Sequence, residues 1–276
     1  MKHYLFAKFF QQFSLDGLME KCAELGLDGP TALIRDGYWL NKENFFSEVG
    51  NYVKAAERCG LEVKYADTDI PMDGIDAHID ELKAMKDAGI EQFRLAYVVK
   101  EKFPGHPREM HDFAVRNMTH VAEVAESIGI QAIVQLHGYM YPHNATSAYF
   151  AIKGLNPRWI GIKLDPGNNY AQEGFEVYRY QIPLLGEYIA ALGAKDALLV
   201  QDPDKGDGTK GWRRPFAPAF EGCSDYKQVF TELKKVGFHG PAVLMPFYHE
   251  DNYELLERDL KKEIAYFKAL EAEAGI

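Results

Sequence analysis

A glycine that recurs at the end of each helix-like segment constrains the fold more than any other feature of this sequence. It sits between apolar or small residues, as in ELGLDG at 24–29, and a short β-like run follows it each time. We expect each such glycine just after a helix C-terminus, where the backbone enters the left-handed region that glycine adopts without a Cβ clash. The repeat therefore predicts alternating helices and strands. The glycines are Gly26, Gly60, Gly89, Gly129, Gly193 and Gly237.

Eight β-forming runs complete this pattern. Segments with apolar residues at i, i+3 and i+4 separate them, including one over residues 180–192, and these segments predict helices. Eight alternations of strand and helix favour an α/β fold, a closed parallel (β/α)8 TIM barrel forming one domain over residues 1–276. A doubly wound open sheet is the alternative, but no GxGxxG follows the first strand. The predicted strands are 3–9, 27–34, 61–68, 91–98, 130–137, 159–165, 196–202 and 241–247.

The charge balance limits the classes of partner. The chain has 31 Lys and Arg against 41 Asp and Glu, a formal net charge of −10. Binding to nucleic acid needs a basic surface, so we expect no nucleic-acid partner. A small anionic substrate needs only local cations and stays open. No apolar run approaches the ~18 residues of a membrane span, and the three cysteines show no CxxC spacing. We expect a cytoplasmic protein without a membrane partner, and leave a homo-oligomer open.

The carboxyl ends of the predicted strands should hold the active site, because barrel enzymes carry it there. Gln135 and His137 on one strand share inward parity with Lys163 and Asp165 on the next. We predict catalytic roles for His137, Asp165 and Lys163. The imidazole titrates nearest neutral pH, and a hydrogen bond to Asp165 would raise its pKa and orient it as an acid or base.

A long segment after the seventh predicted strand is the second candidate feature. Residues 203–222 far exceed the usual ~2–6 residues of such a connection. We predict that this loop closes over the barrel mouth and that Arg213 or Arg214 points into it, to bind an acidic or polyhydroxylated carbohydrate. The residues predicted to contact this small-molecule substrate are Gln135, His143, Asn168, Gln201, Trp212, Arg213, Arg214 and His249.

Two segments carry a family resemblance. IGIKLDPGNN at 160–169 and the run from RRPFAPAFEG at 213 to PAVLM at 245 resemble the xylose-isomerase-like TIM barrels. This is the sugar phosphate isomerase/epimerase superfamily, which also holds endonuclease IV. The resemblance implies isomerisation or epimerisation of sugars. It also implies a divalent metal (Mn, Mg or Zn) bound by Glu, Asp, His and Glu at the ends of strands five to eight.

At the metal positions, the sequence departs from the family. Asp165 matches, but Gln135 and Met245 stand where Glu is expected, and Leu199 stands at the His of the family's His-x-Lys-Asp pattern. Hard cations prefer oxygen ligands, so we expect no cofactor. If a metal binds, we expect Asp165, Gln135 and His137 as its ligands, with Asp202 or His249 as further alternatives.

These observations favour a sugar or sugar-acid isomerase or epimerase that works by acid–base chemistry beside a carbonyl, without the usual metal site. Two alternatives remain. One is a lyase acting on an oxidised sugar or glycoside, and the other is a non-catalytic sugar-binding or partner subunit. A DNA-repair endonuclease is disfavoured by the acidic charge balance.

Overall fold

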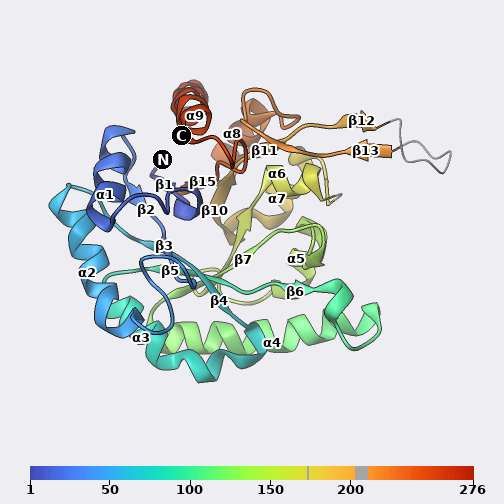
Figure 1. The fold of residues 1–276 in the computed structure, drawn as a ribbon. Coiled ribbons are helices and arrows are strands. Elements are labelled where there is room, and N and C mark those ends of the chain that lie inside the picture. The colour runs from blue at the N-terminus through green and yellow to red at the C-terminus, as the bar shows by residue number, and fades with distance from the viewer. Residues whose placement is uncertain (173, 203–210) are drawn as a thin grey trace.

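The computed structural model describes residues 1–172, 174–202 and 211–276. Its main sheet is parallel and curls into a barrel with strand order β2-β1-β15-β10-β9-β7-β5-β4-β3 (Figure 1). The first and last members, β2 (Gly29–Pro30) and β3 (Ala32–Leu33), are two pieces of one strand separated by Thr31. The β2 piece pairs with β1 and the β3 piece pairs with β4, so the two ends of the order meet. The prediction of an α/β TIM barrel is confirmed.

Helices surround this barrel and connect its strands (Figure 1). The other barrel strands are β1 (His3–Leu5), β4 (Tyr65–Ile70), β5 (Gln92–Leu95), β7 (Gln131–Gln135), β9 (Ile160–Leu164), β10 (Ile189–Ala194) and β15 (Ala242–Leu244). The helices are α1 (Leu15–Glu24), α2 (Phe45–Arg58), α3 (Ile79–Asp87), α4 (Pro107–Ile128), α5 (Ala145–Ile152), α6 (Pro166–Ala171), α7 (Tyr178–Leu185), α8 (Tyr226–Lys235) and α9 (Tyr253–Ala274). Within the described ranges, none of these helices is both long and apolar enough to cross a membrane.

Five of the six repeat glycines have the positive φ expected after a helix, namely Gly26, Gly60, Gly89, Gly129 and Gly237. The sixth assignment is wrong, because Gly193 lies inside β10. This strand falls in the part of the chain predicted to be helical up to residue 192. The helix α7 ends earlier, at Leu185, and Gly186 follows with a φ of 50°.

The predicted seventh strand, residues 196–202, is therefore also wrong as a barrel strand. This run is extended, but it forms two antiparallel ribbons outside the barrel. In one, β11 (Asp196–Ala197) pairs with β14 (Phe216–Ala217), and in the other β12 (Val200–Asp202) pairs with β13 (Gly211–Arg213). The strand that fills the barrel position is the fully buried β10. In the predicted run, Leu199 is 46% exposed, which does not fit a barrel strand.

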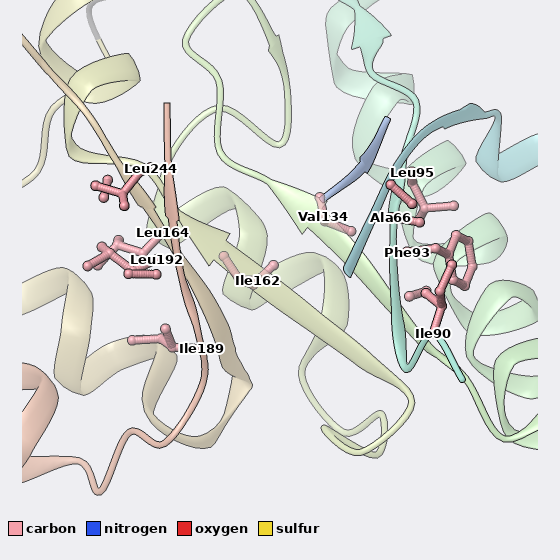
Figure 2. Packing of buried hydrophobic residues seen from close by; sticks show 14 of the residues in the cluster. Ala66, Ile90, Phe93, Leu95, Val134, Ile162, Leu164, Ile189, Leu192 and Leu244 are labelled. Carbon is pink, nitrogen blue, oxygen red and sulfur yellow. The ribbon is translucent and has the colours of Figure 1, made fainter. Parts of the chain in front are cut away.

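Alternation along each barrel strand sorts side chains into two layers. On β7, Ile133 belongs to the interior cluster, while Val134 belongs to the larger layer between strands and helices. Figure 2 shows Val134 in this outer layer with Ile162, Leu192 and Leu244. The interior cluster consists of Tyr4, Phe6, Leu33, Tyr65, Ile133, Ala190, Ala191, Val243 and Met245. Continuing the period of two beyond Ile133 and Ala191 places Gln135 and Gly193 in the barrel mouth.

Candidate active site

A cavity of about 200 Å³ lies at the carboxyl ends of the barrel strands. Aromatic rings form part of its wall, contributed by Phe6, Tyr97, Phe216 and Phe247. Among the described residues that line it, one is a carboxylate, Asp67, and four are cations: Lys8, Arg35, Arg94 and Lys195. Charged side chains thus surround a small space at the place where barrel enzymes carry out their chemistry.

Asp165 holds this end of the barrel together from behind the cavity wall. Its side chain is fully buried and caps α6, because Oδ1 accepts a hydrogen bond of 2.9 Å from the backbone N–H of Asn168. Oδ2 accepts a hydrogen bond of 2.5 Å from Gln135 Nε2 and lies 3.4 Å from Lys195 Nζ. Both carboxylate oxygens are therefore engaged by protein groups, and the residues that engage them line the cavity.

The amide of Gln135 is oriented by partners on both sides. Its Oε1 accepts a hydrogen bond of 2.8 Å from the Tyr97 hydroxyl, and its Nε2 donates to Asp165. The same Nε2 lies 3.8 Å from the sulfur of Met245. The amide oxygen therefore points away from Asp165, and the two side chains do not present a pair of oxygens to a common centre.

His137 lines the cavity, but it does not pair with Asp165, so that prediction is wrong. Its Nε2 accepts a hydrogen bond of 2.9 Å from Gln172 Nε2, whose amide oxygen in turn accepts from the Gly138 N–H. Nδ1 then carries the proton, and it finds no hydrogen-bond partner in the described chain. Burial and the nearby cations Lys195, Arg94 and Lys100 lower the pKa of His137 to about 3. The ring is a neutral N–H donor at physiological pH.

Asp67 is the carboxylate that faces the cavity. Neither of its oxygens accepts a hydrogen bond from the described residues, although Arg94 Nε lies 3.4 Å and Lys163 Nζ 3.7 Å from Oδ1. Lys163 lies beneath it, fully buried, with its ammonium 4.9 Å from the Tyr65 ring centroid. Burial lowers the pKa of Lys163. A carboxylate buried with spare acceptor capacity is positioned to take a proton.

Several predicted substrate contacts lie elsewhere. Gln135, His137 and Asn168 line the cavity, but His143 and His249 do not. His143 Nδ1 lies 3.5 Å from Ser147 Oγ at the start of α5. His249 Nε2 pairs with Asp259 Oδ2 of α9 at 2.9 Å, which ties the segment after β15 to that helix.

The predicted lid reaches the cavity at one described position, Phe216. Gln201 and Trp212 are partners on the β12–β13 ribbon, which projects away from the barrel body (Figure 1). Arg213 is the last residue of β13 and Arg214 follows it; neither is among the described lining residues of this cavity. Residues 203–210, the middle of the predicted lid, lie outside the described residues.

The position of β10 also corrects the comparison with the family's metal ligands. The strand ends at Ala194, so the His-x-Lys-Asp pattern falls on residues 193–196, with Lys195 and Asp196 matching and Gly193 in place of the His. Leu199 is not at that position. A Cβ added at Gly193 would lie 3.0 Å from Asp165 Oδ2, so Asp165 itself fills the space beside this glycine.

The four family positions are thus Gln135, Asp165, Gly193 and Met245, with one carboxylate among them. Within the described part of the chain, no three His, Cys, Asp or Glu side chains gather closely enough to hold a metal ion. The ammonium of Lys195 already lies 3.4 Å from Asp165, and this positive charge opposes a divalent cation beside that carboxylate. These donors do not fit the family's divalent metal.

Comparison with known proteins agrees with this fold. No curated protein matches the chain by sequence. Among solved structures, a D-psicose 3-epimerase in the presence of D-fructose superposes with a TM-score of 0.72 at 12% identity, covering 98% of this chain and 99% of that one. The IOLI protein with a zinc atom gives 0.72 at 16%, covering 99% and 98%. A probable 3-DHS dehydratase from Bacillus anthracis, AsbF, gives 0.68 at 15%, covering 95% and 98%.

These identities show a shared fold. The sequence pattern of one family goes further, because it matches residues 51–270, most of the chain. This match includes six of the barrel strands, from β4 to β15, and the mouth residues from Asp67 to Met245. The chain belongs to the xylose isomerase-like TIM barrel family.

Proposed function

We propose that this protein is an enzyme that transfers a proton at the carbon beside the carbonyl group of a small anionic carbohydrate, such as a sugar acid, without a divalent metal. The charge of the mouth cavity carries this proposal. The whole chain has a net charge of −10, yet four cations and one carboxylate line the cavity among the described residues. Two more carboxylates pair with these cations, Asp69 with Arg35 and Arg94 and Asp165 with Lys195, so four cations still face three carboxylates. A cavity with low-dielectric walls focuses such a local field on a bound anion.

Asp67 is the proposed base. It faces the cavity, and both oxygens keep free acceptor capacity within the described chain. Arg94 and Lys163 flank it, with Nε and Nζ at 3.4 Å and 3.7 Å from Oδ1. Lys163 is buried behind the cavity, so we assign it to holding Asp67 and not to contact with substrate.

His137 is the proposed donor to the substrate oxygen on which negative charge develops. Its Nδ1–H has no described partner, and Gln172 fixes the tautomer from the other side of the ring. A fixed donor in a dry site stabilises an enediolate oxygen without reorganisation at the moment of reaction. Asp165 acts through Gln135, Asn168 and Lys195, which it holds in place at the cavity.

A lyase is the second candidate, and the same machinery supports it. After proton removal beside a carbonyl, an isomerase or epimerase returns the proton to carbon, whereas a lyase expels a leaving group from the next carbon. Structures named as an epimerase and as a probable dehydratase share this fold. We expect a cytoplasmic enzyme, and a homo-oligomer remains open.

Solvent exchange tests the proposal. EDTA-treated protein is incubated in D2O with matched pairs, D-glucuronate with D-glucose and D-galacturonate with D-galactose, and the C2 proton is followed by NMR. We expect proton exchange on a sugar acid at a rate that EDTA treatment does not lower. Asp67→Asn should decrease this rate by at least ~10²-fold. Asp16→Asn, a change on the exposed face of α1, is the control. Exchange only on the neutral sugars, or only after Mn²⁺ is added, would reject the proposal. No exchange on any sugar would favour a non-catalytic binding protein.

A further inference from the structure

Lys195 is the mouth residue with the most specific surroundings. It follows β10, is 4% exposed, and its ammonium lies 3.4 Å from Asp165 Oδ2. The same ammonium lies 4.4 Å from the ring centroid of Phe247 and 4.7 Å from that of Phe216. Burial lowers the pKa of Lys195, whereas the carboxylate and the two aromatic faces favour a positive charge at this point. The long side chain is thus held with its charge at the edge of the cavity.

The position of this charge matters because Asp165 is the one family metal ligand that the chain keeps. We infer that the ammonium of Lys195 takes the electrostatic role of the family's divalent ion: it neutralises Asp165 and donates hydrogen bonds to an oxyanion of the substrate. This inference rests on the proposed function and names the group that receives the substrate's negative oxygen.

Two observations support it. Gly193 leaves no side chain between Lys195 and Asp165, and a Cβ there would already contact the carboxylate at 3.0 Å. Gln135 presents its N–H and not its oxygen toward Asp165, so the carboxylate is surrounded by donors. Asp165 is thus satisfied by an ammonium and an amide, without a metal ion.

A second cation extends the site. The ammonium of Lys8 lies 4.7 Å from the centroid of the same Phe247 ring, so two ammonium groups lie against one aromatic side chain in the cavity wall. Lys195 lies 3.4 Å from Asp165, whereas Lys8 forms no ion pair within the described chain, which leaves positive charge available for a ligand. The class of ligand that fits is a small planar oxyanion, a carboxylate or an enediolate.

Oxalate is a suitable probe because it is a planar dianion that resembles an enediolate and requires no turnover. Its binding is measured by isothermal titration calorimetry on EDTA-treated protein. We expect one site per chain in the wild type, with Mn²⁺ causing no increase in affinity. Lys195→Met should weaken binding at least 10-fold, and Lys195→Arg should retain more of it. Lys227→Met, on the exposed surface of α8, should bind as the wild type does.

Lys195→Met leaves Asp165 buried without its cation, so the variant can lose stability. The double variant Lys195→Met with Asp165→Asn removes both charges, and circular dichroism confirms its fold before titration. Weak oxalate binding by the folded double variant supports the inference. Absence of binding to the wild type, binding that requires Mn²⁺, or wild-type affinity in the folded double variant would overturn it. The proposed function fails on a different result, the lack of proton exchange on any sugar.

Discussion

The lower interior of the barrel and its mouth are built on the same strands, yet they have opposite chemistry. The interior is apolar, with Ile133 on β7, Ala191 on β10 and Val243 on β15. Two residues further along those strands, Gln135 and Gly193 lie beside Asp165. A step of two residues along a strand thus separates the packed core from a buried network of charged side chains.

This difference separates two kinds of requirement. Apolar side chains of the interior need only matching volume, so many residues can serve there. Each charge of the mouth needs a partner at a fixed distance, because a buried charge without one is costly. Substitutions in the two regions should therefore fail in different ways.

The largest loss of stability is expected for Asp165→Ala. The change removes the cap of α6 and leaves Lys195 buried without its carboxylate. We expect a decrease of about 3–5 kcal/mol in the free energy of unfolding, measured by urea denaturation. Asp16→Ala breaks an exposed ion pair with Arg58 and should cost at most about 1 kcal/mol. Equal losses in the two variants would contradict the account of the mouth.

His137→Ala should affect turnover and not folding. Removal of one preorganised donor typically costs about 10²–10³-fold, so we expect a decrease in kcat of that size on the sugar acid found by solvent exchange. Because the pKa of His137 is lowered to about 3, its ionisation should leave no inflection in the wild-type rate between pH 5 and 8. A kcat inflection in that range that disappears in His137→Ala would show that the ring titrates in catalysis, against our assignment.

Glu263 on α9 is a buried carboxyl outside the mouth, and it should influence stability alone. It accepts hydrogen bonds from the Ala219 N–H and the Tyr248 hydroxyl, and burial raises its pKa from 4.5 to about 8. The unfolded chain loses this proton first, so the free energy of unfolding should fall as pH rises from about 4.5 to about 8.

Glu263→Gln should remove much of that fall, on the order of a few kcal/mol, with little change in kcat. Thermal melts of both proteins at pH 5 and pH 8 measure the difference. A wild-type stability that rises across this range, or an identical pH dependence in the variant, would be inconsistent with a neutral Glu263.

The smallest effect is expected in the apolar interior. Ile133→Val removes one methylene from a fully buried side chain and should cost about 0.5–1.5 kcal/mol in urea denaturation. Oxalate affinity should not change, because the substitution lies one layer below the cavity. A tenfold loss of affinity would mean that interior packing and mouth geometry are coupled more tightly than the comparison implies.

The sequence predicted the barrel because its signal is repeated. Seven of the eight predicted strand spans contain a barrel strand, and five glycines have the expected positive φ. The remaining span, the seventh in chain order, is wrong. The small apolar residues of β10 resemble the end of a helix, while the more β-like run at 196–202 pairs outside the barrel. Pairing partners are decided by tertiary contacts that local pattern does not encode.

The site was predictable only in part for the same reason. Parity along the strands identified Gln135 and His137 as mouth residues, and the structure places both in the cavity wall. Lys195 was missed because it follows the misassigned strand, although it lies in the family's Lys-Asp pair. The contact between His137 and Gln172 links residues 35 positions apart, and no spacing rule predicts it. Loop length does not give the direction of a side chain, so it could not place Arg213 and Arg214 relative to the cavity.

The central claim is that the mouth receives an anion and not a divalent cation. Thermal shift of EDTA-treated protein tests it most directly, with Mn²⁺, a set of sugar acids and their neutral counterparts compared at equal concentration. The account predicts that at least one sugar acid raises the Tm, that added salt weakens this effect, and that Mn²⁺ and the neutral sugars leave the Tm unchanged. A rise in Tm with Mn²⁺ that Asp165→Asn abolishes, without stabilisation by any sugar acid, would contradict it.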